Sequence, residues 1–479
     1  MGREIREECF TEADFARFHA ALAGETEQLR HWLRTAQSRN PAPVPRLGFE
    51  IEAWLASSDG RPLPVNDAFL AAMDTALATP ELAQFNIELN SSVFRTGSGC
   101  FARIHEELSD TLHQARRAAH RAGAELLMAG SLPTLQPEDL GLHHMSPQTR
   151  YRALNSAILE QRAQRPLRVD ILGREHLQHS HSDVMLEAAA TSFQVHIETR
   201  PEIAHRTYNA ALVAAAPVLA AAVNTPYLFG YDLWAESRIP LFEQAVEAGG
   251  FAGSARGPIR RVTFGTGYLH ESIGELFTEN QEHFPVLLPV HLDETDARLP
   301  HLSFHNGTIW RWNRPIVGHD ARGQRSLRLE FRCLPAGPSL LDMLANAAFA
   351  LGLIEHLVAE SDNGTLDTPF SEARDNFYNA ARQGLDARLR WAHCEPTPAP
   401  RLITRELLPR ADAGLQRLNI EARERNVLLG TVARRVANRQ TGAQWQRQWV
   451  RRHGPDWPGL LRAYRGWQNT GEPVHTWGL

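Results

Sequence analysis

"LRLEFR", residues 327–332, alternates apolar and charged side chains at every position. A period of two is that of a β-strand, in which successive side chains point to opposite faces. The apolar residues would then face the core, while the other face carries Arg328, Glu330 and Arg332. A strand that aims two guanidinium groups and a carboxylate the same way predicts a polar site on one face of a sheet.

Three other segments alternate in the same way, and their polar faces carry mainly carboxylate, amide and imidazole groups. They are "GFEIE" (48–52) with Glu50 and Glu52, "NIELN" (86–90) with Asn86, Glu88 and Asn90, and "SFQVHIE" (192–198) with Gln194, His196 and Glu198. For any one strand, an outer face that meets water is a sufficient explanation. Together, four strands that bring Glu and His with little else indicate a shared site.

Carboxylates that crowd one face repel each other unless cations neutralise them. Glutamate oxygens with one histidine and no thiolate are better ligands for Mg²⁺ or Mn²⁺ than for structural zinc. Arg332 lies two residues from Glu330 on the same face, and a guanidinium group matches phosphate in a bidentate way. Metal and arginine together suit nucleotide phosphoryl transfer. Arg238 and Arg314 are further candidates, although for each of them alone a surface or core salt bridge is the better explanation.

The order of expected elements favours an α+β fold. Helices are expected at 11–36, 101–124 and 339–361, with an alanine-rich helix opening at Pro201. The strands alternate cleanly, which favours an antiparallel sheet with helices on one face over a doubly wound parallel sheet. We expect an N-terminal helix and linker (1–44), a catalytic domain (45–360) and a C-terminal helical extension packed on that domain (361–479).

Composition excludes several classes of protein. The 479 residues carry a formal charge of only −5 and no long basic block, so nucleic acid is not an expected partner. The charged N-terminus and the lack of a long apolar run predict a cytoplasmic protein without a membrane partner, and a homo-oligomer stays open. The chain contains no lysine, which removes Schiff-base and P-loop mechanisms. The four cysteines lack CxxC spacing, so no thiolate zinc site is expected.

The motifs, in their order along the chain, resemble the glutamate–cysteine ligase family and in particular its bacterial carboxylate–amine ligase branch. Each is short, and their order over about residues 45–360 carries the resemblance, with a family-like helical tail at 441–454. The matching segments are "GFEIE" (48–52), "NIELN" (86–90), "QVHIE" (194–198), "VNTPYLFGYDLWAESR" (223–238), "WNRP" (312–315) and "LEFR" (329–332).

The resemblance implies a funnel-shaped antiparallel sheet like that of glutamine synthetase and guanido kinases. It implies that ATP phosphorylates a small carboxylic acid, with glutamate as a candidate, and that an amine attacks the acyl phosphate to form an amide. Arg238 and Arg332 would act in catalysis and, with Arg314, contact the phosphates; Asn90, Gln194 and Asn224 would bind substrate. The implied ligands of Mg²⁺ or Mn²⁺ are Glu50, Glu52, Glu88, His196 and Glu330.

Two departures and three alternatives stay open. Glu198 stands where the family has glycine, and "NTP" replaces Asn-Ser-Pro, so the substrate pocket is expected to differ. A phosphotransferase of the same superfamily, a metal-dependent hydrolase and a catalytically silent nucleotide-binding protein are the alternatives. If the ligase interpretation holds, Glu52→Gln or Glu330→Gln should abolish metal-dependent ATP turnover with little loss of fold.

Overall fold

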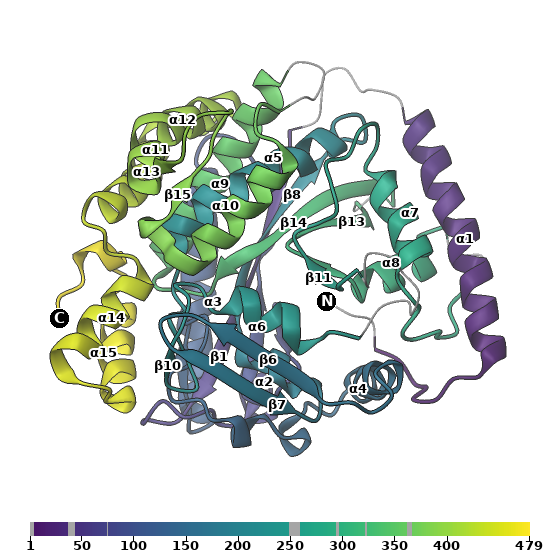
Figure 1. Ribbon diagram of the computed structural model, residues 1–479, viewed down its shortest axis with the longest axis horizontal. Coiled ribbons are helices and arrows are strands. Elements are labelled where there is room, and N and C mark those ends of the chain that lie inside the picture. The colour runs from purple at the N-terminus through teal and green to yellow at the C-terminus, as the bar shows by residue number, and fades with distance from the viewer. Residues whose placement is uncertain are drawn as a thin grey trace.

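A curved antiparallel sheet forms the centre of the computed structural model, which describes residues 4–36, 44–73, 75–248, 259–293, 297–320, 323–361 and 366–479. Its main strands run in the order β13-β14-β8-β1-β3-β2, and strands β13, β14 and β8 can be followed in Figure 1. Short strands β4 (Phe94–Arg95) and β5 (Glu125–Leu127) pair with the two ends of β1. The main strands are β1 (Arg46–Ala56), β2 (Ala78–Pro80), β3 (Asn86–Asn90), β8 (Ser192–Thr199), β13 (Asn313–His319) and β14 (Arg325–Pro335).

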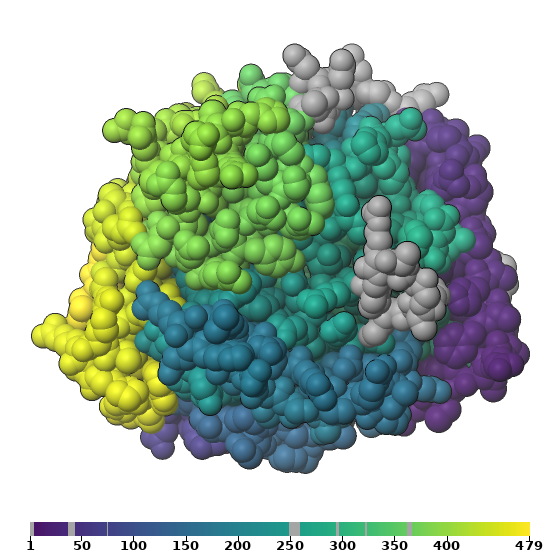
Figure 2. Space-filling model, viewed as in Figure 1, coloured from purple at the N-terminus to yellow at the C-terminus, as the bar shows by residue number. Residues whose placement is uncertain are grey.

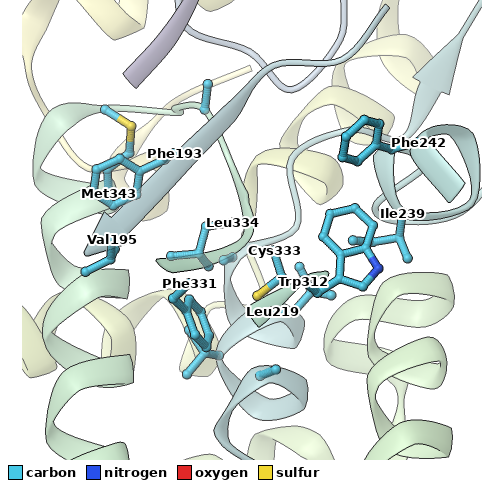
Figure 3. Close-up of a cluster of buried hydrophobic side chains, with 14 of the residues drawn as sticks. Phe193, Val195, Leu219, Ile239, Phe242, Trp312, Phe331, Cys333, Leu334 and Met343 are labelled. Carbon is cyan, nitrogen blue, oxygen red and sulfur yellow. The ribbon is translucent and has the colours of Figure 1, made fainter. Parts of the chain in front are cut away.

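Apolar side chains from β8 and β14 face a layer of helices. Val195 and Phe331, from these two strands, lie in the same cluster as Leu219 of α5 (Ala204–Ala222) and Met343 of α9 (Leu340–Glu360) (Figure 3). The predicted alternation of "LRLEFR" is therefore confirmed, because Leu327, Leu329 and Phe331 are buried. Helix α9 is long and apolar enough to cross a membrane, but most of it is buried inside the protein.

The C-terminal helices form a further layer over α5 and α9. Helix α10 packs on α5, and α12 and α13 pack on α9. A buried ion pair between Arg435 of α13 and Asp342 of α9, 2.7 Å long, links the two layers. The C-terminal helices are α10 (Phe370–Gln383), α11 (Ala399–Leu402), α12 (Leu408–Arg417), α13 (Ala422–Ala437), α14 (Gly442–His453) and α15 (Trp457–Thr470).

Helix α1 (Glu12–Thr35) lies on the opposite edge of the molecule from the C-terminal helices (Figure 2). It packs on α7 (Gly274–His283) and α8 (Pro300–Gly307). The expected linker after α1 falls largely on residues 37–43, which lie outside the described residues. The remaining helices are α2 (Asn66–Ala72), α3 (Cys100–Arg121), α4 (Thr149–Gln161) and α6 (Arg238–Ala245).

Several short strands lie outside the central sheet. The segment 167–173 forms β6 (Leu167–Leu172), which pairs only with β7 (His176–His181) and stays outside the central sheet. The short turn between these strands brings β7 back beside β6, so β6 pairs with the strand that follows it in the sequence. Three further two-stranded sheets are small: β9 (Tyr227–Leu228) with β10 (Tyr231–Asp232), β11 (Val262–Thr263) with β12 (Trp310–Arg311), and β15 (Arg388–Leu389) with β16 (Thr397–Pro398).

Candidate active site

The polar face of the sheet borders a pocket of about 620 Å³. Helices α4 and α8 close its sides with Tyr151, Leu154 and Phe304, so the pocket combines a charged floor with an apolar wall. The strands contribute Glu50, Glu52, Glu88, Gln194, Arg314 and Arg332 to the lining. The four alternating strands predicted from the sequence thus converge on one space.

Strand register brings Glu50, His196 and Glu330 together. His196 is opposite Glu330 across β8 and β14, and Glu50 is opposite Gln194 across β1 and β8. The His196 Nε2 atom lies 2.8 Å from Glu50 Oε1 and 3.8 Å from Glu330 Oε1. Among the described residues these three form a group that could hold a metal ion, with donor atoms within 4.8 Å of one another.

The buried Nε2 atom of His196 fits a metal ligand. Although it lies near Glu50, it makes no hydrogen bond of acceptable geometry, and a buried nitrogen without one is costly unless another partner binds it. Arg328 Nε donates to His196 Nδ1 over 3.1 Å, so Nδ1 is unprotonated in this arrangement. Because a neutral imidazole has one free lone pair, metal binding at Nε2 would require Arg328 to withdraw and Nδ1 to take the proton.

Glu330 is fully buried, with 0% of its surface exposed, and two arginines neutralise it. Arg314 donates from Nε and Nη2 over 2.8 and 3.0 Å, and Arg332 Nη1 donates over 2.8 Å. Burial alone would raise the pKa of Glu330, but Arg314 and Arg332 outweigh it and hold that pKa well below its ordinary value. At Glu50 burial would also raise the pKa, but the charge of His196 when its ring is protonated, together with its close contact, outweighs burial and lowers that pKa to about 2. This end of the pocket is therefore ionised at neutral pH.

A β-bulge in β14 lies at Arg332, whose side chain belongs to this hydrogen-bond network. Between Phe331 and Leu334 the pairing of β14 with β8 shifts register, so Arg332 and Cys333 share the space opposite Gln194. Arg332 Nη1 also donates to Gln194 Oε1 over 2.7 Å. Cys333 is buried in the core, and burial raises the pKa of its thiol.

The other end of the pocket holds carboxyl groups with the opposite tendency. Glu52 accepts from the Ser192 backbone N–H over 2.6 Å and from Gln194 Nε2 over 2.8 Å. Burial raises the pKa of Glu52 despite the opposing charge of Arg332, and burial together with Glu88 and Glu52 raises the pKa of Glu81 well above its ordinary value. Burial therefore disfavours the charged forms of Glu52 and Glu81, and a bound cation would favour them.

Sequence reasoning missed Glu81 and Glu187, which both line the pocket. Glu81 lies between β2 and β3, and Glu187 lies in a 3₁₀ turn at Val184–Ala189. Neither belongs to an alternating strand, so no periodicity marks them. Burial raises the pKa of Glu187 from an ordinary 4.5 to about 8, with a further increase from Glu52 that Arg332 partly opposes.

The raised pKa of Glu187 predicts a pH-dependent stability. Between pH 4.5 and about 8 the folded protein retains a proton that the unfolded chain releases, so stability falls as pH rises through this window. Glu187→Gln should remove this loss and raise the melting temperature at pH 8 without changing it at pH 4.5. Thermal unfolding with a chelator present, compared with wild type at both pH values, tests this; an equal shift at both would contradict it.

Arg238 and Asn224, two expected site residues, lie outside the main pocket. Arg238 is buried, pairs with Glu236 over 3.3 Å and donates to the Cys333 carbonyl oxygen. It lines a small cavity of about 20 Å³ behind Arg332, so contact with a phosphate in the main pocket would have to pass Arg332. Asn224 is 0% exposed and donates to the Ala336 carbonyl and the Tyr464 hydroxyl, each over 2.8 Å, which accounts for it as a structural residue.

Asn90 and Glu198 act on their neighbours instead of lining the pocket. Asn90 Nδ2 donates to Glu88 Oε1 over 2.7 Å, and Thr79 Oγ1 donates to the same oxygen over 3.2 Å, so both orient Glu88. Glu198 accepts from Arg46 Nε over 2.8 Å. Arg46 therefore neutralises the carboxylate that Glu198 brings to this face of the sheet.

Comparisons with known proteins agree with this architecture. A glutamate–cysteine ligase from Francisella tularensis in complex with AMP has a TM-score of 0.54 at 11% identity, covering 89% of each chain. A bifunctional glutathione synthetase from Pasteurella multocida has a TM-score of 0.51 at 11% identity, covering 93% of this chain and 53% of that one. Both similarities show the fold. No curated protein sequence matches.

The family is shown by a different comparison. The model of glutamate-cysteine ligase family 2 matches residues 46–466, which include all the strands that line the pocket and most of the C-terminal helices. This range covers well over half of the 479 residues. The chain therefore belongs to glutamate-cysteine ligase family 2.

Proposed function

We propose that this protein is an ATP-dependent carboxylate–amine ligase that forms an amide through an acyl phosphate. One observation carries the proposal: Glu50, His196 and Glu330 converge beside Arg314 and Arg332 at one end of a pocket. Family membership supports the same assignment. Oxygen ligands with a single imidazole suit Mg²⁺ or Mn²⁺.

In this proposal Glu50, His196 and Glu330 hold the metal ion, and Glu52 and Glu88 extend the ligand set toward the other end of the pocket. When bound, the metal would neutralise phosphate charge. Among the described residues, Arg332 uses only Nη1 in its hydrogen bonds, which leaves its other N–H groups for a phosphate. Arg314, held by Glu330, borders the same space.

A free carboxylate is a poor electrophile and must be activated before an amine can attack it. Transfer of the γ-phosphoryl group to a substrate carboxylate forms a new O–P bond and releases ADP. The amine then attacks the acyl carbon, the C–O bond to phosphate breaks, and the ammonium proton leaves to a base or to water. Fixed positive charge that stabilises both transition states supplies the catalysis, so no protein nucleophile is required.

A screen of amino acids and amines tests the proposal. With Mg²⁺ and ATP, the correct acid and amine should together stimulate ADP release, with one amide formed for each ADP and no release after metal is chelated. Mass analysis separates the alternatives: a phosphorylated acceptor would indicate a phosphotransferase, and substrate hydrolysis without ATP would indicate a hydrolase. Either of these results would contradict the ligase proposal.

A further inference from the structure

Helix α1 lies outside the segment that matches the family, which begins at residue 46. It nevertheless packs tightly on the catalytic region, along the edge formed by α7 and α8 (Figure 1). Phe18, Leu22 and Leu29 on its inner face are buried. Helix α1 therefore buries an apolar face beside α8, which forms a wall of the pocket.

Glu25 of α1 reaches the N-terminus of α8. Its Oε2 accepts the Leu302 backbone N–H over 2.8 Å, and its Oε1 lies 2.6 Å from His301 Nδ1. Both partners are in the first turn of α8, whose backbone N–H groups have no acceptor within the helix. Leu299, at the N-cap position, has no side-chain oxygen to supply one. Glu25 therefore caps α8 from another helix, and its negative charge suits the positive end of the α8 dipole.

The contact between Glu25 and the first turn of α8 is buried. Glu25 is 4% exposed and His301 is 2% exposed. The Phe18 ring of α1 packs edge-on against the His301 ring, with centroids 5.1 Å apart. Phe18 also lies edge-on to Phe304, at 6.5 Å. Removing the Glu25 carboxylate would leave the Leu302 N–H and His301 Nδ1 without this buried partner.

The other side of α8 belongs to the candidate active site. Ser303, Phe304 and Gly307 line the pocket. The Gly307 carbonyl oxygen, at the end of α8, accepts from Arg314 Nη1 over 3.3 Å, and Arg314 in turn holds both oxygens of Glu330. A continuous set of contacts thus runs from Glu25 through α8 to the arginine proposed to contact phosphate.

We propose that Glu25 is a positioning residue of the active site: by capping α8 it fixes the pocket wall and Arg314 for nucleotide binding. Helix α1 then contributes to the geometry of the active site, although it precedes the segment that matches the family. The inference rests on the proposed function for its ligand, but the cap itself is a property of the protein without ligand.

Three full-length variants test this inference. Glu25→Ala removes the cap. Glu25→Gln keeps an amide oxygen for the Leu302 N–H, and its amide N–H₂ can donate to His301 Nδ1 once the ring proton moves to Nε2. Glu27→Ala is the matched control, because Glu27 lies on the same helix, is exposed and pairs only with Arg30 and Arg34 among the described residues. If Glu25→Ala does not fold, Glu25→Asp keeps the charge and withdraws the carboxylate by one methylene.

Two measurements are compared across these variants. Glu25→Ala should weaken Mg·ADP binding roughly tenfold by calorimetry, as expected for a lost cap, and should speed hydrogen exchange in α8. Glu25→Gln should recover most of both properties, and Glu27→Ala should change neither. A purely structural role would lower the melting temperature and leave the Kd for Mg·ADP unchanged, which would overturn the inference.

The inference and the proposed function fail separately. Unchanged exchange of the α8 amides in Glu25→Ala would show that Glu25 is no cap, whatever ligand binds. Absence of Mg·ADP binding by the wild-type protein would instead count against the ligase proposal, and faster exchange in α8 would still support the cap.

Discussion

Glu330→Gln is expected to abolish ATP turnover and also to destabilise the fold. Turnover should fall on the order of a thousandfold, because the substitution removes a proposed metal ligand and releases the two arginines that it orients. Stability should fall by roughly 3–5 kcal/mol, because Arg314 and Arg332 would then be buried cations without their shared carboxylate. ADP release with Mg²⁺ and urea unfolding of the metal-free protein measure the two effects.

Glu198→Gln is the matched control for Glu330→Gln. Glu198 lies on the same polar face, but it pairs with Arg46, and its side chain is 24% exposed. Its loss should cost little stability, because partly exposed ion pairs contribute about 0–1 kcal/mol. Equal loss of activity in both variants, or a Glu330→Gln protein as stable as wild type, would show that the buried network does not carry the role given to it.

Glu52→Gln is expected to abolish turnover while leaving the fold intact. Burial raises the pKa of Glu52, so the folded protein disfavours its charge, and a neutral amide resembles the protonated acid. Above the ordinary pKa of 4.5 the wild type loses stability as pH rises, so the variant should be equal or more stable at neutral pH. Urea unfolding at pH 7 without metal, beside ADP release with metal, tests both parts.

Glu52→Gln and Glu330→Gln are expected to differ in stability, although the sequence predicts the same effect for both. The alternating pattern predicts little loss of fold for either, since each glutamate lies on a crowded acidic face. The structure supports that prediction at Glu52 and opposes it at Glu330, because Glu330 has two guanidinium partners and Glu52 has mainly neutral hydrogen-bond donors. A Glu52→Gln protein that unfolds as readily as Glu330→Gln would contradict this distinction.

Strand periodicity predicted the part of the site that lies on strands. Alternation fixes which face a side chain occupies, and the structure places Glu50, Glu52, Glu88, His196 and Glu330 on the predicted polar face. It does not fix strand order or register, and these bring Glu330 opposite His196 while β6 is left outside the sheet. The bulge at Arg332 also has no sequence signal of its own.

The alternating pattern could not predict the pocket residues that lie outside the strands. Glu81 and Glu187 reach the pocket from a loop and a 3₁₀ turn, whose course depends on tertiary packing. Arg238 and Asn224 were chosen by their place in a motif, yet Glu236 accepts hydrogen bonds from the Arg238 guanidinium and the Asn224 backbone N–H. Sequence spacing does not reveal that a nearby carboxylate will hold both residues away from the pocket.

Anomalous diffraction from crystals soaked with Mn²⁺ and a non-hydrolysable ATP analogue tests the central claim most directly. We expect manganese between Glu50, His196 and Glu330, with Arg328 moved off His196 Nδ1 and the phosphates of the analogue beside Arg332. Manganese bound elsewhere, or a nucleotide bound outside this pocket while Arg328 still donates to His196, would contradict it.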